Sequence, residues 1–472
     1  MKYISTRGQA PPVSFTEMLL AGLAPDGGLY LPQTYPQFSQ DAIAGLAGKS
    51  YSEAALEILS PFVAGEIEAP DLCRIIEAAY ARFRHKAVAP LVQLEANLFV
   101  LELFHGPTLA FKDLAMQLLA RFIGHALQAR GQRATIIGAT SGDTGAAAIE
   151  AFRGLAQADV FILYPHGRVS EVQRRQMTAS GAGNVHTIAL QGTFDDAQAC
   201  VKSLFNNTRL RSELNLCGVN SINLARILFQ TVYYFTSAVA LGSPHRPVSF
   251  AVPTGNFGDI FAGWMAKRMG LPLGRLVIAA NSNDILARTL ASGRYAVKAV
   301  QATQSPSMDI QVSSNFERLL FEAQGRDAAA ICSSMAGLQQ SGCFTIPQGP
   351  LENIRAEFDA FSTTEEETAL AIDAFWRETG YLADPHTAVA LSAALKAKVQ
   401  GPGGPCVVLG TAHPAKFPSA TERAAGVRQG LPPHLSDLFE RKESYSVLPN
   451  DQHEIEKFIR ARAARSSKRA AS

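Results

Sequence analysis

One lysine of this sequence has apolar neighbours and could therefore act as a nucleophile. Residues 101–120 read LELFHGPTLAFKDLAMQLLA, and Lys112 follows Phe111 in the first turn of an apolar helical pattern. A desolvated lysine is a better nucleophile than a solvated one, and a Schiff base with an aldehyde cofactor is one use of such a residue. The alternative is a side chain that reaches solvent, with Asp113 as a surface partner. Because buried lysines are rare, these twenty residues alone favour the second interpretation.

A glycine-rich loop, PTGNFGD at residues 253–259, lies between an apolar strand pattern and a helical pattern. Glycines allow several backbone amides to turn toward one point, and the N-terminus of a helix adds partial positive charge. The loop matches neither G-x-G-x-x-G nor a Walker sequence, so it does not indicate a dinucleotide or a nucleoside triphosphate. It is interpreted either as a phosphate-binding loop or as a tight structural turn.

A second loop between a strand and a helix, ATSGDTGAAA at residues 139–148, is richer in hydroxyl groups. The hydroxyls of Ser141 and Thr144, together with amides around Gly142 and Gly145, suit a carboxylate at the start of a helix. A helix that is merely capped by a serine or an aspartate explains the same residues.

Two further segments carry polar side chains in apolar surroundings. In VVLGTAHPAKF (residues 407–417), the Thr411 hydroxyl suits a ring nitrogen, and Lys416 faces the same end of the strand, whereas His413 is interpreted as structural. In NSINLARILFQ (residues 220–230), Arg226 lies on an apolar helix face. This arginine either pairs with an internal carboxylate or binds a substrate anion, because its planar fork is bidentate.

The elements that must position these residues are strands that alternate with helices. We expect strands at residues 98–104, 134–140, 160–164, 185–190, 248–252, 276–280 and 406–409, and helices at 146–153, 169–180, 194–206 and 260–269. Within a mostly helical region at residues 1–95, Ser52 and Asp71 are the expected N-caps. Alternation of this kind predicts an open, mainly parallel sheet covered on both faces, with ligands at the carboxyl ends of its strands.

The composition indicates a globular enzyme. The chain has 472 residues, of which 47% are hydrophobic and 18% are charged, and its net charge of +2 gives no reason to expect a nucleic-acid partner. Six scattered cysteines, without a C-x-x-C pair or a histidine cluster, favour a reducing compartment and no metal site. The sequence has no signal-like start and no apolar run long enough to span a membrane, so we expect a cytoplasmic protein without a membrane partner.

The motifs that carry these residues resemble those of the threonine synthases. HGPTLAFKD, at residues 105–113, has the form of the lysine segment that binds pyridoxal phosphate in that family. The resemblance extends from Ser5 to Phe417 through STRG, GLAPDGGLYLP, TSGDTGAAA, NSIN-x-AR, PTGNFGD, PSMDI-x-VSSNFER and TAHPAKF. TSGxTG is shared by many pyridoxal-phosphate enzymes of the tryptophan-synthase-β fold, whereas GLAPDGGLYLP and PSMDI…SSNFER are specific to the longer bacterial and fungal threonine synthases.

The resemblance implies a set of cofactor-binding residues. Lys112 would carry pyridoxal 5'-phosphate as a Schiff base and act as the catalytic base and acid, and Thr411 would meet the pyridine nitrogen. The phosphate of the cofactor would lie on the loop residues Gly255, Asn256, Phe257 and Gly258. Asp143 stands where many relatives have an asparagine that donates to the phenolate oxygen, and an aspartate donates only when it is protonated.

The resemblance also implies a fold and a reaction. The fold would be two open, mainly parallel sheets flanked by helices, with an N-terminal domain at residues 1–95, a catalytic region at 96–430 with the cofactor cleft between two subdomains, and a helical tail at 431–472 that ends in disorder. The enzyme, a monomer or homodimer, would convert O-phospho-L-homoserine and water to L-threonine and phosphate by γ-elimination and β-hydration.

Under this reading, Ser141, Gly142 and Thr144 bind the substrate carboxylate, and Arg226 binds its phosphate, with Lys416 as a second candidate. One alternative is a lyase that releases 2-oxobutyrate from the same substrate, because it shares the elimination half of the reaction. Another is a catalytically silent binding protein of the same fold. Lys112, the GNFG loop and Thr411 occur together, which speaks against a silent protein.

Overall fold

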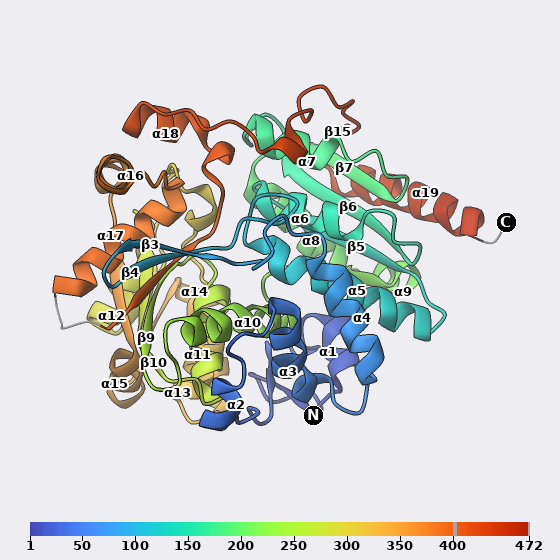
Figure 1. Ribbon diagram of the computed structural model, residues 1–472. Coiled ribbons are helices and arrows are strands. Elements are labelled where there is room, and N and C mark those ends of the chain that lie inside the picture. Colours follow the sequence, from blue (N-terminus) through green and yellow to red (C-terminus); the bar gives the residue numbers. More distant parts are fainter. Residues whose placement is uncertain (400–403, 471–472) are drawn as a thin grey trace. The chain divides into compact units, whose positions relative to one another are not determined.

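The computed structural model describes residues 1–399 and 404–470, and these form two compact units. Unit 1 comprises Met1–Met18, Leu23–Phe111 and Ser221–Gly430. Unit 2 comprises Leu19–Gly22, Lys112–Asn220 and the chain from Leu431 onward. Each unit is built around one parallel-rich sheet, which confirms the predicted fold class (Figure 1). The predicted domain bounds at residues 95 and 430 stay a prediction.

The sheet of unit 1 has six strands in the order β13-β10-β9-β14-β4-β3. The bounds are β13 Phe358–Ser362, β10 Leu273–Ala280, β9 Val248–Pro253, β14 Cys406–Gly410, β4 Leu98–Glu102 and β3 Leu91–Glu95. All neighbours are parallel except β3, which pairs with β4 in the antiparallel direction. The central strands β9, β14 and β4 therefore bring the loops that follow them to one edge of the sheet. These loops carry the PTGNFGD, TAHPAKF and HGPT motifs.

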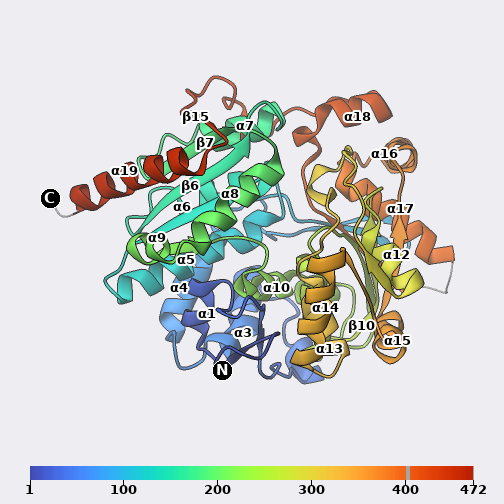
Figure 2. The ribbon, with the colours of Figure 1, turned by 180° about the vertical axis from the view of Figure 1, so that it is seen from behind.

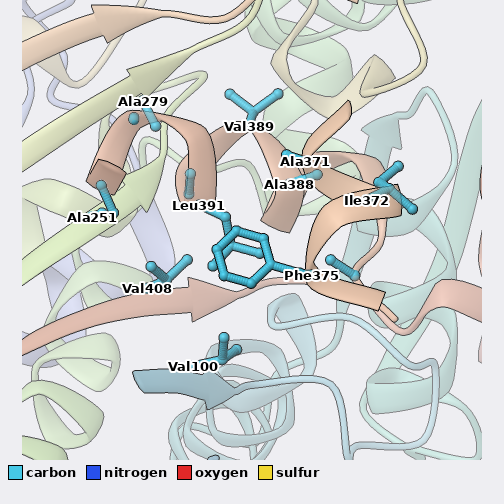
Figure 3. Close-up of a cluster of buried hydrophobic side chains, with 14 of the residues drawn as sticks. Val100, Ala251, Ala279, Ala371, Ile372, Phe375, Ala388, Val389, Leu391 and Val408 are labelled. Atoms are coloured by element: carbon cyan, nitrogen blue, oxygen red, sulfur yellow. The ribbon is translucent and has the colours of Figure 1, made fainter. Parts of the chain in front are cut away.

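One face of this sheet is covered by α17 (Pro385–Val399), on which α16 (Glu365–Thr379) packs in turn. Figure 3 shows how Phe375 and Leu391 of these helices meet Val100 and Val408 of the strands in a buried cluster. Alanines of the strands and of the helices, among them Ala251 and Ala388, belong to the same cluster. Helix α16 begins with a capping box, in which Thr364 and Glu367 bond reciprocally.

The remaining helices of unit 1 include α10 (Leu224–Ala240) and α11 (Gly258–Arg268), which pack against each other. The hydroxyls of Tyr233 and Tyr234 on α10 both donate to the Asp259 carboxylate in the first turn of α11. This contact fixes the helix that follows the PTGNFGD loop to the helix that carries Arg226.

The N-terminal region contains α1 (Phe15–Ala21), α2 (Gln40–Ala44), α3 (Tyr51–Val63) and α4 (Ala69–Tyr80), and β1 (Tyr3–Ser5) pairs with β2 (Tyr30–Pro32). The predicted N-caps of α3 and α4 are wrong. Ser50 caps α3, because it forms a capping box with Glu53, and Glu68 precedes α4, whose first turn contains a proline that cannot donate a hydrogen bond.

The sheet of unit 2 has five parallel strands in the order β15-β7-β6-β5-β8. The bounds are β15 Ser446–Pro449, β7 Val185–Gln191, β6 Ala158–Pro165, β5 Ala134–Ala139 and β8 Leu216–Gly218. In the views of Figures 1 and 2, α6 (Asp143–Phe152) and α7 (Glu171–Thr178) lie on one face, and α8 (Phe194–Asn206) and α19 (Gln452–Ala470) on the other. α5 (Lys112–Ala129) packs against α6.

The C-terminal segment contributes to the core of unit 2. β15 adds a strand beside β7, and Ile455 and Ile459 of α19 are buried against residues of α8. The predicted helix is therefore present, whereas strand β15 was not predicted. The helix extends to Ala470, and the disorder expected for the SSKRAAS end at residues 466–472 stays a prediction, with residues 471 and 472 outside the described residues.

The remaining elements are divided between the two units. They are α9 (Thr208–Leu214), α12 (Ile285–Ser292), β11 (Arg294–Ala296), η1 (Pro306–Met308), α13 (Phe316–Ala323), α14 (Ala328–Ser341), β12 (Cys343–Thr345), α15 (Gln348–Glu357), η2 (Pro414–Lys416), α18 (Pro418–Ala425) and η3 (Pro433–Leu435). Within the part of the chain that the structure describes, none of the helices combines the length and the apolar character needed to cross a bilayer.

The turn after β14 is capped by a neutral histidine. His413 precedes the 3-10 turn η2, and its Nδ1 accepts a hydrogen bond of 3.1 Å from the Ala415 amide. Burial lowers the pKa of His413 to about 4, and the neighbouring His105 and Lys416 act in the same direction, whereas the carboxylates of Glu102 and Asp384 oppose them. An Nδ1 that accepts a hydrogen bond carries no proton, which agrees with the neutral ring. His413 is thus structural, as the sequence indicated.

We predict that His413→Asn makes the protein less sensitive to acid. An unfolded histidine has a pKa near 6.5. Since the folded pKa is about 4, only the unfolded chain takes up this proton as the pH falls below 6.5, and the stability present above that value is lost toward pH 4. An asparagine keeps an acceptor for the Ala415 amide but does not titrate. Urea unfolding between pH 7 and pH 4.5 should give a shallower decline for the variant.

The exposed His453 provides the control. His453→Asn should leave the pH dependence of the unfolding free energy as it is in the wild type. An equally steep decline in His413→Asn would show that this ring does not carry the effect.

Candidate active site

The PTGNFGD loop runs from the end of β9 to the start of α11. Phe257 is the N-cap residue of α11 with a left-handed φ of 64°, and its side chain forms no cap hydrogen bond. Its ring is buried between Phe316 and Phe358, which holds the backbone in that conformation. The N-terminal amides of α11 and the positive end of its dipole are therefore available to an anion.

Gly255 allows a close contact between two backbone segments that a residue with a Cβ would prevent. A Cβ added at this position would lie 2.9 Å from the backbone oxygen of Ser307 and 3.4 Å from the Cα of Met308. Only a glycine therefore lets the loop pass this close to the 3-10 turn η1. Together with the N-terminus of α11, this cradle fits a phosphate group, and the assignment of the loop to the cofactor phosphate stays a prediction.

Thr411 lies at the end of β14, beside the segment that leads to Lys112. The Phe111 amide donates to the Thr411 carbonyl at 2.8 Å, and Ala110 and Ala412 form an antiparallel bridge. Leu109 reaches this arrangement through a left-handed φ of 62°. These contacts fix the backbone of Thr411 next to Phe111. Phe111 directly precedes Lys112 in the chain.

Arg226 is in the first turn of α10, after the N-cap Asn223, whose side chain accepts from the Ala225 amide. The arginine is only 4% exposed. Burial lowers its pKa to about 10, so the guanidinium is charged at neutral pH. A buried cation at the start of a helix suits an anionic ligand, and whether it binds the substrate phosphate stays a prediction.

Lys416 is fully buried, and its ammonium donates to the Thr108 carbonyl at 2.8 Å. The contact joins the turn after β14 to the HGPT loop after β4. Lys416 thus supports this loop, and its role toward the substrate phosphate stays a prediction.

In unit 2, Lys112 begins α5 and is only 9% exposed. Its Nζ lies 3.4 Å from Oδ2 of Asp143. Oδ1 of that aspartate accepts a hydrogen bond of 2.9 Å from the side-chain Nε2 of Gln173. The alternative of a lysine that reaches solvent beside Asp113 is therefore wrong. The ammonium is buried and lies next to a different carboxylate, in the position of a nucleophile withheld from water.

The loop at residues 139–145 begins α6 with a glycine cap. Gly142 is the N-cap, without a side-chain cap bond, and the Thr140 hydroxyl accepts from the amides of Gly142 and Gly145 at 2.9 Å each. The alternative of a serine or aspartate cap is thus wrong, because the N-cap is Gly142 and the hydroxyl that accepts from the Gly145 amide in the first turn belongs to Thr140. Ser141 and Thr144 remain partly exposed at the N-terminus of α6, where a carboxylate would be favoured.

Sequence reasoning missed several residues that hold these loops. Gln173 and Thr140 carried no signal, because an isolated glutamine or threonine is common. Asp384 and His386 lie in a buried pair at 2.8 Å, and His386 Nε2 accepts from the Ser307 amide beside Gly255. The DPH sequence that contains the pair was visible but has no spacing that predicts a contact with Ser307.

The structure gathers the predicted residues in two groups, one in each unit. Unit 1 holds Gly255, Asn256, Phe257, Gly258, Thr411, Arg226 and Lys416. Unit 2 holds Lys112, Asp143, Ser141, Gly142 and Thr144. The first group has the features of an anion site, and the second has a buried amine next to a helix N-terminus.

Comparison with known families covers most of the chain. The model described as "Pyridoxal-phosphate dependent enzyme" matches residues 83–411. "Threonine synthase N terminus" matches residues 2–80, and "Threonine synthase, C-terminal" matches residues 387–459. The threonine synthase of Pseudomonas aeruginosa is 51% identical over 460 residues, which are 97% of this chain and 98% of that protein.

Solved structures agree with these matches. The crystal structure of the PLP-bound threonine synthase from Brucella melitensis is similar with a TM-score of 0.95 and 59% identity, over 98% of this chain and 99% of that one. The yeast threonine synthase structure is similar with a TM-score of 0.93 and 38% identity, over 98% and 99% of the two chains. The chain described here therefore belongs to the threonine synthase family of pyridoxal-phosphate-dependent enzymes.

Proposed function

We propose that this chain is an enzyme that uses pyridoxal 5'-phosphate to convert O-phospho-L-homoserine and water to L-threonine and phosphate. The observation that carries the proposal is the buried Lys112 at the start of α5, in the lysine segment of a family whose members match over nearly the full length. The matched relatives are named threonine synthases, and the glycine cradle of unit 1 fits a phosphate group.

Each part of the chain has a role in this proposal. Pyridoxal phosphate, when bound, supplies an electron sink for a carbanion next to the substrate amine. Lys112 binds the cofactor and then moves protons at Cα and Cβ of the substrate, first as a base and later as an acid. Its burial excludes the water that would compete for these protons. The Thr411 hydroxyl would form a hydrogen bond with the ring nitrogen of the cofactor, and Asp143 lies near the lysine amine.

The substrate has two anionic ends, and the chain offers a binding group for each. The partly exposed Ser141 and Thr144 would bind the carboxylate at the N-terminus of α6, whereas the amide of Gly142 already donates to the Thr140 hydroxyl. Arg226 would bind the phosphate, because a guanidinium presents a bidentate donor pair. Lys416 is the weaker candidate, since its ammonium already donates to Thr108.

The proposal also covers the compartment and the partners of the enzyme. The net charge of +2 and the scattered cysteines favour a cytoplasmic enzyme that acts on a small molecule without a nucleic-acid or membrane partner. A monomer and a homodimer are both compatible with the sequence.

The reaction is tested by incubating the purified protein and pyridoxal phosphate with O-phospho-L-homoserine. We expect threonine and inorganic phosphate in equal amounts, measured by amino-acid chromatography and a phosphate assay. Release of 2-oxobutyrate and ammonia in place of threonine would identify a lyase without the hydration step. Absence of any phosphate release would leave a binding protein of the same fold.

Substitution of Lys112 tests the catalytic assignment. We predict that Lys112→Ala lowers kcat by about 10³-fold or more, because both the covalent anchor and the proton-transfer group are lost. Lys112→Arg keeps a cation near Asp143 but offers no amine to the cofactor, so it should be equally inactive. Steady-state kinetics and the visible absorption of the bound cofactor measure the two losses.

Lys202→Ala, at an exposed position of α8, is the matched control and should keep the kcat and the absorption of the wild type. Circular dichroism should show the same helix content in all variants. Substantial threonine formation by either Lys112 variant would overturn the assignment.

Substitution of Arg226 tests the substrate-phosphate assignment. We predict that Arg226→Ala raises KM for O-phospho-L-homoserine about ten- to a hundredfold, because a charge-assisted contact is lost, while cofactor affinity changes little. Arg226→Lys should give an intermediate KM, since it retains the charge without the planar fork. Arg377→Ala, at an exposed position of α16, serves as the control. An unchanged KM in Arg226→Ala would mean that this arginine is structural.

A further inference from the structure

Two carbonyl groups of the PTGNFGD loop are held by side chains of the PSMDI-x-VSSNFER motif, to which the sequence analysis gave no role. The Ser313 hydroxyl donates to the Gly255 carbonyl at 2.7 Å. Asn315 donates to the Asn256 carbonyl twice, from its backbone amide at 3.1 Å and from Nδ2 at 2.8 Å. The segment 313–315 therefore clamps two successive peptide groups of the loop.

These clamps determine where the loop amides point. A peptide group is planar and, in its trans form, directs its C=O and the next N–H to opposite sides. The only cis bond recorded among the described residues is Ser243-Pro244, so the peptides after Gly255 and Asn256 are trans. Because their carbonyls face the segment 313–315, the N–H groups of Asn256 and Phe257 face away from it. A glycine-rich loop without such clamps can rotate its peptides freely.

The clamping segment is itself held from three sides. The Arg318 guanidinium donates to Oδ1 of Asn315, to the Tyr30 carbonyl at 2.9 Å and to the Ile222 carbonyl at 2.7 Å. The Ser313 amide donates to the Tyr295 hydroxyl at 2.8 Å. All these groups are buried or partly buried, so water has little access to compete for these hydrogen bonds. Tyr30 is in strand β2 of the N-terminal region, and Ile222 precedes the helix that carries Arg226.

We propose that Ser313 and Asn315 are positioning residues that turn the Asn256 and Phe257 amides toward the cofactor phosphate, with Arg318 linking this clamp to the N-terminal strand β2. The inference rests on the proposed function, in which this loop binds the phosphate of pyridoxal phosphate. It also assigns a task to the N-terminal region. Strand β2 supplies the carbonyl that fixes the arginine behind the phosphate loop.

The test compares two ligands that differ only in the phosphate group. Dissociation constants for pyridoxal phosphate and for pyridoxal are measured by fluorescence quenching on the purified full-length chain after cofactor removal. The variants are Ser313→Ala, which removes one donor, and Asn315→Asp, which keeps an acceptor for Arg318 but lacks the amide donor. Ser314→Ala is the control, because this serine is partly exposed and the side-chain contacts with the loop described above come from its neighbours Ser313 and Asn315.

We expect each variant to bind pyridoxal phosphate about tenfold more weakly than the wild type, as for the loss of one buried hydrogen bond. The affinity for pyridoxal, which has no phosphate to place on the loop, should stay as it is in the wild type. Ser314→Ala should match the wild type with both ligands. Thermal unfolding shows whether each variant folds. If Asn315→Asp does not fold, the result for Ser313→Ala alone tests the inference.

Two results would overturn the inference while the proposed function stands. One is that Ser313→Ala and Ser314→Ala bind pyridoxal phosphate equally well. The other is that the affinities for both ligands fall by the same factor, since the residues would then support the fold and not the phosphate contact. A wild-type chain that binds pyridoxal phosphate no better than pyridoxal would instead contradict the proposed function itself.

Discussion

The buried pair of Lys112 and Asp143 is the interaction on which the arrangement of unit 2 depends. An ammonium that is removed from water costs on the order of several kcal/mol unless a partner and further hydrogen bonds compensate it. Asp143 lies 3.4 Å away and is itself held by Gln173. The three residues come from α5, α6 and α7, so the charge pair requires these helices to meet at one point.

Unit 1 stabilises its buried cations in a different way. Arg318 donates to the carbonyls of Tyr30 and Ile222, and Lys416 donates to the carbonyl of Thr108. Carbonyl oxygens satisfy the donors without a formal negative charge, so these contacts leave the positive charge of the cation in place. Such a region favours anions, and the uncapped start of α11 adds to the effect. This is the environment that a phosphate-binding loop needs.

Much of the fold could be predicted because buried parallel strands read as short apolar runs. Helix α8 and the strands β5, β6, β7, β9 and β14 lie where the pattern placed them, to within a few residues. The edge strands β13 and β15 were missed, since one side of an edge strand has no strand to pair with and its side chains are partly exposed. The N-caps of α3 and α4 were misplaced because several nearby residues could serve as caps, and only the reciprocal bond with Glu53 selects Ser50.

The sequence by itself determined which residue types stand at each loop: a lysine in an apolar turn, glycines before α11, and an arginine on a buried helix face. These properties can be read from neighbouring residues along the chain. Only the tertiary structure decided the partners. Lys112 pairs with Asp143, 31 residues away, and Ser313 holds the Gly255 carbonyl across 58 residues. Such contacts depend on which loops the strand order brings to one edge of a sheet, and no spacing along the chain encodes that order.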